Sequence, residues 1–419
     1  MTTAVTTTLA APLMLPNRTF LPNRIAKAAM SECLGDLKLA PTRRHVELYR
    51  RWSQSGAGLL ITGNIMVDRS AIGEVGNVAV DDRRDLEILT EWAQAARSQG
   101  AQVWAQINHP GRQIPLTLNA HPVAPSAIAV ADTAGLFRKP RELRNDEIEQ
   151  IIAKFATSAG ILTEAGFTGI EIHAAHGYLI SQFLSPTSNV RTDKWGGSRE
   201  NRRRFLLEIV RAVRAQIGTD ATLAVKLNSA DFQRGGYDED EAAEVVRALA
   251  AEGIDALEIS GGTYESTAFL GPAEPAKAST AAREAYFLDF AELIRAQTQL
   301  PLLLTGGFRS AAGMAATIES GAIDVVGLAR PLVVEPDLPA RLLTGQAKSY
   351  DARPRTIGIA RLDGATELLW HTTQLWRLAD GKDPAPNRHP LLTLTHYFSR
   401  QIPYTAHRLT RRFTTAKRG

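Results

Sequence analysis

Short apolar runs alternate along this chain with longer stretches in which apolar residues recur at helical spacing. Eight runs have the length and the Val, Ile, Leu and Ala content of buried strands: residues 23–29, 58–65, 102–108, 169–174, 223–228, 256–261, 301–307 and 324–330. Helical spacing appears between most of them, over residues 42–55, 84–98, 145–165, 198–216, 239–252, 283–297 and 310–320. Asn145 and Ser198 are suited to N-cap their helices, and Gly166 and Gly253 are suited to end theirs.

Strands that alternate with helices predict right-handed βαβ units and a parallel sheet, and eight of them predict closure into a (β/α)8 barrel. An open, doubly wound sheet is the alternative. Such a sheet favours a glycine-rich turn after its first strand, and NRIAKAAMSE, residues 23–32, contains no such turn. We therefore expect an α/β protein with a TIM barrel over residues 1–350. A short helical and basic C-terminal extension is expected over residues 351–419.

Composition excludes several classes of protein. Hydrophobic residues make up 44% of the chain and charged residues 22%, which is typical of a globular protein with a large core. Cys33 is the single cysteine, so the chain cannot form an internal disulfide or supply the thiolates of an iron–sulfur cluster or structural zinc site. No window approaches 18 uninterrupted apolar residues, and no positive segment precedes LAAPLML near the start. We expect a cytoplasmic protein without a membrane span.

The positive charge is concentrated at the end of the chain. After Asp383 there is no further acidic residue, and removing the seven positive charges beyond it changes the net charge from +4 to 4 − 7 = −3. Basic tails of this kind can bind nucleic acid, but most are simply solvated, so we expect nucleic acid to be an unlikely partner. A non-catalytic barrel with a nucleic-acid-binding tail is the alternative from a different functional class. The seven residues are Arg388, Arg400, Arg408, Arg411, Arg412, Lys417 and Arg418.

The ends of the predicted strands are where a barrel places its active site. Gly306 and Gly307 follow the seventh strand, and Ala329 and Arg330 follow the eighth. Backbone N–H groups and a guanidinium at this place commonly bind phosphate in barrels. The sequence TGG alone is more often a tight turn, and the phosphate interpretation depends on Arg330 after the next strand. We predict a phosphorylated ligand there.

Polar side chains also end the third, fourth and fifth strands. Gln106 and Lys226 suit the polar edge of a flat heterocycle. His173, His176 and Tyr178 come together in HAAHGY, where three interpretations compete. A metal site is disfavoured, because Ala174 stands where H-E-x-x-H has its glutamate and Gly177 disfavours a helix. A purely structural role would bury several polar groups that need partners. The third interpretation fits best: two imidazole N–H groups hold a carbonyl or nitro oxygen, and Tyr178 is a general acid.

The longer stretch EIHAAHGYLISQFLSPTSNVRTDKWGGSRENRRRF, residues 171–205, resembles the signature of the Old Yellow Enzyme family, and the likeness extends over residues 16–338. The resemblance implies an FMN-dependent NAD(P)H:flavin oxidoreductase or ene-reductase. NADH or NADPH would reduce bound FMN, and an activated alkene would then take a hydride from flavin N5 and a proton at its alpha carbon.

The resemblance also implies roles for individual residues. His173 and His176 would hold the substrate oxygen, and Tyr178 would donate the proton. Binding of FMN would involve the segment Ala28, Ala29, Met30 and Ser31 against the ring, Asn64 through its backbone, Gln106 and Lys226 at the pyrimidine, and Gly306, Gly307, Ala329 and Arg330 at the phosphate.

Five of these positions depart from the family pattern. Ala29 stands where many members have proline, Asn64 replaces a small residue, and Ala329 replaces a glycine. Ser31 replaces threonine or cysteine but can still donate a hydrogen bond to the flavin. Lys226 replaces an arginine: it keeps the positive charge and loses the bidentate fork.

We therefore expect an enzyme that acts on a small-molecule substrate, with the possibility of a homo-oligomer. Its predicted reaction is reduction of the C=C bond of an alkene activated by a carbonyl or nitro group. A catabolic reductase of nitro or other xenobiotic compounds is the alternative within the same family.

Overall fold

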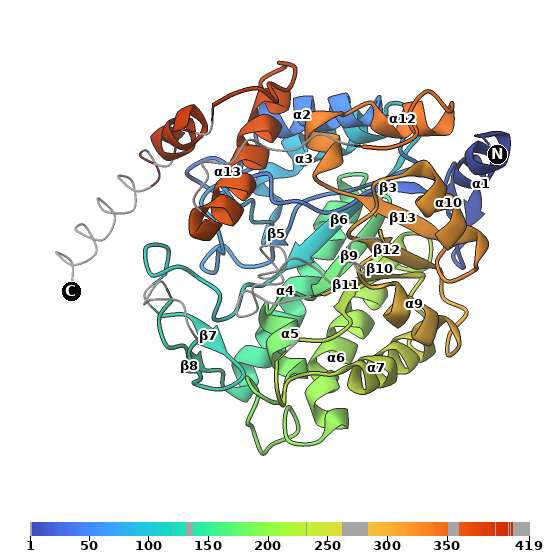
Figure 1. Ribbon diagram of the computed structural model, residues 1–419. Helices are drawn as coiled ribbons and strands as arrows, with labels where there is room; N and C mark the ends of the chain where they lie inside the picture. Colours follow the sequence, from blue (N-terminus) through green and yellow to red (C-terminus); the bar gives the residue numbers. More distant parts are fainter. Residues whose placement is uncertain are drawn as a thin grey trace.

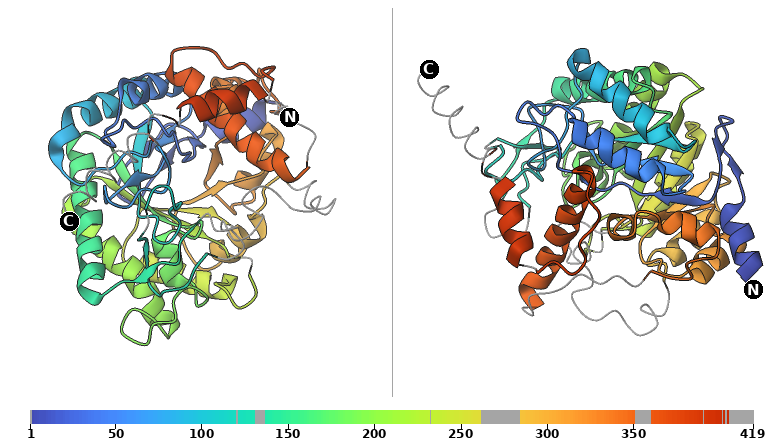
Figure 2. Two further views of the ribbon diagram at one scale, coloured as in Figure 1. Left: turned by 90° about the vertical axis from the view of Figure 1, so that its left-hand side faces the viewer. Right: turned by 90° about the horizontal axis from the view of Figure 1, so that it is seen from above.

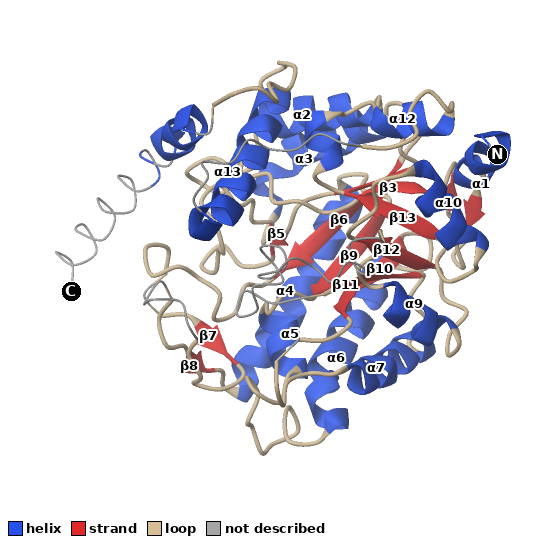
Figure 3. Ribbon diagram, in the orientation of Figure 1, coloured by secondary structure: helices blue, strands red, loops and turns tan. Residues whose placement is uncertain are grey.

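Eight parallel strands form the centre of the computed structural model, and helices surround them (Figures 1 and 3). In ring order the strands pair as β3–β4–β6–β9–β10–β11–β12–β13, β13 pairs with β3, and the pairing of β4 with β6 closes the ring. This closure confirms the predicted (β/α)8 barrel and excludes an open sheet, which would leave two unpaired edges. The strands are β3 (Ile25–Lys27), β4 (Leu59–Ile61), β6 (Gln102–Asn108), β9 (Gly169–Ala174), β10 (Thr222–Asn228), β11 (Ala256–Ser260), β12 (Leu302–Thr305) and β13 (Val325–Leu328).

The structure describes residues 2–119, 121–130, 137–231, 233–261, 284–350, 360–389, 391–400, 402 and 404. Every predicted helical segment contains a helix, so the predicted alternation is confirmed. The helices between the strands are α2 (Arg43–Ser53), α3 (Leu86–Arg97), α4 (Asn145–Glu164), α6 (Arg199–Ile217), α7 (Glu239–Ala251), α9 (Leu288–Arg295) and α10 (Ala311–Glu319). Ser198 caps α6 as predicted, because its hydroxyl accepts the N–H of Asn201. Gly166 and Gly253 follow α4 and α7 with positive φ angles, as predicted for helix ends.

Asn145 is not the N-cap of α4, so that prediction was wrong. The cap is Arg144, whose backbone N–H donates to the Glu147 carboxylate at 2.8 Å. The Asn145 side chain is used elsewhere, since its Oδ1 accepts a hydrogen bond from Arg191 at 2.9 Å. A glutamate at the third helical position therefore takes the place of the expected asparagine cap.

The predicted strand over residues 58–65 is interrupted. Strand β4 ends at Ile61, and a separate strand, β5 (Ile65–Met66), follows. Gly63 lies between them, and its N–H donates to Glu32 Oε1 at 2.7 Å. A Cβ atom at Gly63 would stand 2.1 Å from Glu32 Oε2. The chain therefore leaves the ladder where only glycine can approach this carboxylate.

A short hairpin closes the amino-terminal end of the barrel. It consists of β1 (Leu13–Met14) and β2 (Phe20–Leu21), and its Leu15 and Leu21 pack with inward-facing strand residues such as Trp104 and Leu303. Helix α1 (Thr2–Ala10) packs nearby on α10 and α12 (Leu338–Leu343). The opposite end of the barrel, where the strands end, is thus the one open to a ligand.

The C-terminal extension contributes α13 (Ala360–Ala379), which covers the predicted helical stretch 366–378 and packs against α2 and α11 (Pro331–Val334). Figure 2 shows α13 beside α2 at the edge of the barrel. Of the basic tail, Arg388 and Arg400 are described, and Arg400 pairs with Asp380 at 2.8 Å. The other five basic residues of the tail lie outside the described residues: Arg408, Arg411, Arg412, Lys417 and Arg418.

Within the described ranges, no helix is long and apolar enough to cross a membrane.

Candidate active site

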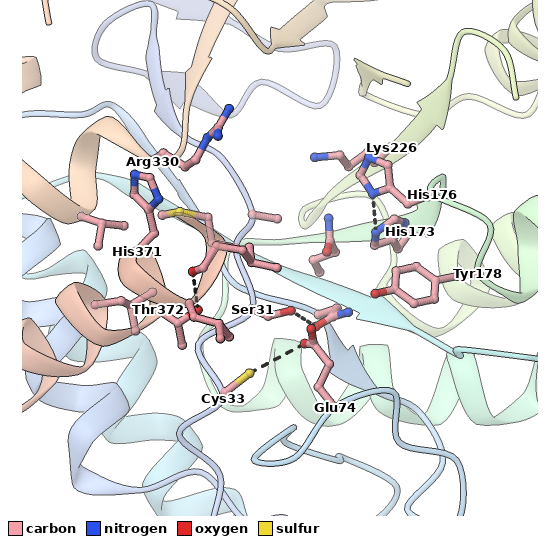
Figure 4. A pocket seen from close by; sticks show the side chains of 18 of the residues that line it. Ser31, Cys33, Glu74, His173, His176, Tyr178, Lys226, Arg330, His371 and Thr372 are labelled. Carbon is pink, nitrogen blue, oxygen red and sulfur yellow. Dashed lines mark hydrogen bonds between the residues drawn. The ribbon is translucent and has the colours of Figure 1, made fainter. Parts of the chain in front are cut away.

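A cavity of about 230 Å³ lies where the barrel strands end (Figure 4). Ten of the fourteen predicted site residues line it: Ala29, Met30, Ser31, Asn64, Gln106, His173, His176, Tyr178, Lys226 and Arg330. The other four, Ala28, Gly306, Gly307 and Ala329, lie in the turns that follow β3, β12 and β13. These three strands are neighbours in the barrel.

A strained turn brings the two histidines together. His173 lies within β9, whereas His176 has a φ angle of +60° and Gly177 a φ angle of +74°. The backbone of His176 is held on both sides: its N–H donates to Asn228 Oδ1 at 3.1 Å, and its carbonyl accepts Gln113 Nε2 at 2.8 Å. A left-handed histidine costs about 1–3 kcal/mol and persists only where its surroundings enforce it. The turn therefore serves to place the second imidazole beside the first.

The two imidazoles form a hydrogen-bonded chain that ends on Ser260. His173 Nε2 and His176 Nδ1 are 3.3 Å apart, and His176 Nε2 is 2.8 Å from Ser260 Oγ. The backbone N–H of Ala175 donates to His173 Nδ1 at 3.2 Å, which leaves the ring proton of neutral His173 on Nε2. His173 Nε2–H thus points at His176.

Both imidazoles are neutral at neutral pH. Burial, followed by the neighbouring charge of Lys226, lowers the pKa of His176 to about 3. Burial also holds the pKa of His173 well below its ordinary value, and His176 and Lys226 add to this effect. The pair therefore provides neutral N–H donors without being a source of protons.

Tyr178 stands next to this pair, at the N-terminus of α5 (Leu179–Leu184). Its ring packs edge-on against His173, with 4.9 Å between the ring centroids, and it is only 5% exposed. Figure 4 shows its hydroxyl directed into the cavity, below His173. A phenol in this place can deliver a proton to an atom of a ligand whose oxygen lies at the histidines.

Two buried glutamates hold Gln106 and Lys226. Gln106 Nε2 donates to Glu171 Oε1 at 2.7 Å, which leaves its carbonyl oxygen for the cavity. Glu258 Oε1 accepts hydrogen bonds from Lys226 Nζ at 2.9 Å and from the Thr305 hydroxyl at 2.6 Å. The two residues predicted to bind the polar edge of a flat heterocycle, Gln106 and Lys226, are therefore held in place by the buried glutamates.

The two buried carboxyl groups differ in acidity. Burial and the neighbouring Glu258 raise the pKa of Glu171 well above its ordinary value. Burial also opposes ionisation of Glu258, but Lys226 and the hydrogen bonds from Glu171 and Thr305 outweigh it and lower that pKa. Among the described residues, Glu171 Oε2 and Glu258 Oε2 are buried without a hydrogen-bond partner, and the raised pKa of Glu171 favours its protonated form. Neutral Glu171, anionic Glu258 and cationic Lys226 form a buried group with no net charge.

A second polar group lines the same cavity as Ala29 and Met30. The Ser31 hydroxyl donates to Asn64 Oδ1 at 3.1 Å, and the Cys33 thiol lies 3.7 Å from Glu74 Oε2 (Figure 4). Two departures from the family pattern, Ser31 and Asn64, are thus bonded to each other. The asparagine replaces a small residue without leaving its amide unsatisfied.

The predicted phosphate end combines two glycines with Arg330. Gly306 and Gly307 have φ angles of +129° and +86°, which only glycine adopts readily. Arg330 Nη1 pairs with Glu367 of α13 at 2.7 Å. At the start of α10, the Glu284 carboxylate accepts the N–H groups of Arg309 and Ser310. The helix predicted over 283–297 begins only at Leu288, and Glu284 before it lies against Gly307 and binds the turn that leads into α10.

The described residues contain no group of three or more His, Cys, Asp or Glu side chains that could hold a metal ion.

The sequence did not predict the polar residues that hold the site residues in place, Ser260, Glu171 and Glu258, or the wall of the cavity that α13 forms. Ser260 ends the sixth strand, a strand end for which no chemistry was predicted. Glu171 and Glu258 are charged residues inside apolar strand runs, GIEIHA and ALEIS, and this pattern was a usable signal because a buried charge needs a partner. The wall formed by α13 carries no signal in the sequence, because helical spacing does not say what a helix packs against.

The sequence profile of the NADH:flavin oxidoreductase / NADH oxidase family matches residues 8–349. An NADH-dependent flavin oxidoreductase of Hypocrea jecorina, iliE, is 38% identical over 365 residues, which are 81% of this chain and 90% of that protein. The relative of the same name from a Neonectria species is 40% identical over 352 residues, and the match covers 78% of this chain but only 46% of that protein. Among solved structures, the Old Yellow Enzyme homologue of Zymomonas mobilis superposes with a TM-score of 0.69 at 26% identity, over 82% of this chain and 94% of that one.

Proposed function

The chain belongs to the NADH:flavin oxidoreductase / NADH oxidase family, the Old Yellow Enzyme family, and on that premise we propose that it reduces the C=C bond of alkenes activated by a carbonyl or nitro group. FMN is the cofactor, and NADH or NADPH is the electron donor. The observation that carries the proposal is the placement of two neutral imidazoles and the Tyr178 hydroxyl on one cavity. A cytoplasmic location, a homo-oligomeric state and the division of the chain at residue 350 stay predictions.

The residues present fit FMN. Ala29 and Met30 offer an apolar face to a flat ring system, and Gln106 and Lys226 offer an acceptor and a cation to its pyrimidine edge. Gly306, Gly307, Ala329 and Arg330, which follow the neighbouring strands β12 and β13, would take the phosphate, and Ala28 after β3 would lie against the ring. When bound, FMN supplies a two-electron carrier that accepts a hydride from the nicotinamide and passes it to the substrate.

Gln106 and Lys226 act from fixed positions. Glu171 holds the Gln106 amide by its N–H, and Glu258 and Thr305 hold Lys226 through a shared carboxylate. A fixed cation beside bound FMN would stabilise negative charge on its pyrimidine edge without reorganisation. Lys226 can therefore supply the positive charge that an arginine supplies in the family pattern, and Glu258 holds the Lys226 side chain in place.

His173 and His176 are proposed to hold the substrate oxygen. An oxygen that accepts from both rings needs a proton on His173 Nε2 and another on His176 Nδ1. The first is already assigned by Ala175. The second requires that His176 Nε2 become an acceptor, and the Ser260 hydroxyl 2.8 Å away can supply the hydrogen bond because a hydroxyl both donates and accepts. Ser260 thus acts as a positioning residue for the tautomer of His176.

Tyr178 is proposed as the proton donor. Two imidazole donors withdraw charge onto the substrate oxygen, which makes the beta carbon electrophilic toward a hydride. Once the beta carbon has taken the hydride, the negative charge is shared between the oxygen and the alpha carbon, and the alpha carbon can accept a proton. Tyr178 packs against His173, so its hydroxyl lies beside any group whose oxygen is held by that ring. The hydroxyl then regains its proton from solvent.

Purified protein tests the proposal as a whole. Protein saturated with FMN should be yellow, should lose its visible absorbance on anaerobic addition of NADH or NADPH, and should regain it on addition of cyclohex-2-enone with formation of cyclohexanone. Bleaching without recovery by any enone, enal or nitroalkene would contradict alkene reduction while leaving flavin reduction intact. Protein that binds no FMN would contradict both.

Replacing Ser260 with alanine should slow the alkene-dependent recovery of flavin absorbance by about tenfold, the worth of one hydrogen bond of about 1–1.5 kcal/mol. The reason is that His176 Nε2 loses the donor that favours its productive tautomer. Ser260→Thr keeps the hydroxyl and should stay near the wild-type rate. Anaerobic stopped-flow absorbance measures both variants, and equal rates for alanine and threonine would refute the tautomer role.

A further inference from the structure

The C-terminal extension forms one wall of the catalytic cavity. Six of its residues line the cavity together with the predicted site residues: Leu368, Leu369, His371, Thr372, Leu375 and Tyr397. Figure 4 shows His371 and Thr372 across the cavity from His173, His176 and Tyr178. These residues lie beyond residue 349, where the match to the family profile ends. The wall is therefore a feature of this chain that the family pattern does not describe.

The wall is firmly docked on the barrel. Trp376 of α13 is buried, and its indole N–H donates to the carbonyl of Glu32 at 3.0 Å. Arg44 of α2 forms an ion pair with Asp380 at 2.7 Å. The ring of Tyr397 stacks parallel to that of Trp376, with 5.5 Å between the ring centroids. Contacts of these three kinds fix the orientation of α13, so its cavity face is as well defined as the strand ends opposite.

The cavity face of α13 is mainly apolar. Three leucines contribute to it: Leu368, Leu369 and Leu375. The side chain of Leu368 is 47% exposed although it lines the cavity. His371 Nδ1 donates to the carbonyl of Glu367 at 2.9 Å, and burial lowers the pKa of His371 to about 4, so this imidazole is neutral. An exposed leucine at the wall of a cavity is covered favourably by an apolar group of a ligand.

The cofactor does not account for this face. Its proposed polar partners come from the ends of barrel strands, and the contact that the described part of α13 makes with them is the ion pair of Glu367 with Arg330. What remains opposite the imidazoles is a surface for an uncharged, apolar group.

We propose that Leu368, Leu369 and Tyr397 bind an alkyl or aryl substituent of the substrate while its oxygen lies at His173 and His176. The inference deepens the proposed function and depends on it. The substrate class is thus an activated alkene with a sizeable apolar substituent, and the C-terminal extension determines that preference.

Binding of unreactive analogues tests the wall separately from catalysis. Saturated 3-alkylcyclohexanones carry the oxygen without the alkene, and their binding to the FMN-loaded protein is followed by the change in flavin absorbance. From methyl to butyl, each added methylene should tighten binding by about three- to fourfold. In Leu368→Ser the gain per methylene should fall below about twofold. Leu391→Ser is the matched control, since Leu391 is 58% exposed and does not line the cavity; its gain should equal that of the wild-type protein.

Three outcomes would overturn the inference: no gain with chain length in the wild-type protein, the same gain in Leu368→Ser, or loss of FMN from Leu368→Ser without a change in the gain. The last outcome would assign the wall to the cofactor. If the gain follows the prediction but no alkene is reduced, the proposed reaction fails and the apolar site stands. If alkenes are reduced but the gain is absent, the reaction stands and the wall does not.

Discussion

Replacing Tyr178 with phenylalanine is expected to slow alkene-dependent recovery of flavin absorbance by about 10²–10⁴-fold, the usual contribution of a positioned general acid. The phenylalanine ring keeps the edge-on contact with His173, so the cavity should keep its shape and the protein its FMN. Reduction by NADH or NADPH needs no proton from Tyr178 and should stay within about threefold of the wild-type rate. Anaerobic stopped-flow absorbance of the two half-reactions measures both effects.

A solvent isotope effect separates the chemical role of Tyr178 from a structural one. If the tyrosine proton moves in the alkene step, wild-type protein in D₂O should be slowed in that step and not in flavin reduction. Equal loss of both half-reactions in Tyr178→Phe would show that the residue shapes the site without donating a proton. Wild-type rates in both would show that the proton comes from elsewhere.

The barrel could be predicted from the sequence because its signal is periodic and local. Strands such as 102–108 and 169–174 match β6 and β9 residue for residue, since buried parallel strands are continuous apolar runs. Errors arose where a side chain had a competing partner. Asn145 does not cap α4 because Arg191 takes its amide, and β4 ends early because Gly63 approaches Glu32. Both partners are distant along the chain, so no local sequence pattern indicates these contacts.

The residues of the candidate site were predictable because barrels gather the ends of their strands. That rule alone predicts that Gln106, His173 and Lys226 share one cavity, as they do. The same rule does not predict which buried residues hold these side chains in place. Glu171 and Glu258 orient Gln106 and Lys226 from within the barrel, and the opposite shifts of their two pKa values follow only from three-dimensional proximity.

The wall from α13 was beyond prediction for a different reason. Apolar residues at helical spacing in 366–378 indicate that a helix buries one face, and they leave open what that face covers. In the structure, the anchoring residues and the cavity residues lie on the same helix: Trp376 packs on the barrel, while Leu368 and Thr372 face the cavity. The proposed catalytic residues thus lie within residues 8–349, which match the family profile, and the surface opposite them lies beyond that match.

Replacing His176 with glycine is expected to lower the rate of the alkene step by about 10²–10³-fold, the usual cost of removing one donor from an oxyanion site. Glycine is the informative choice because the φ angle of +60° at this position would strain any other residue without a side-chain donor. His173 would keep its Nε2–H and bind the oxygen alone. Because burial lowers the pKa of His176 to about 3, the wild-type alkene step should show no ionisation of this imidazole near neutral pH.

His176→Asn is the matched control, because asparagine tolerates the left-handed conformation and its amide restores one N–H donor. It should recover the alkene step to within about tenfold of the wild-type rate, at unchanged thermal stability and FMN content. If asparagine is as slow as glycine, the second donor is not what His176 contributes, and the imidazole acts through its contact with Ser260. If glycine is as fast as wild type, one imidazole is enough to hold the oxygen, and the strained turn at His176 serves the fold.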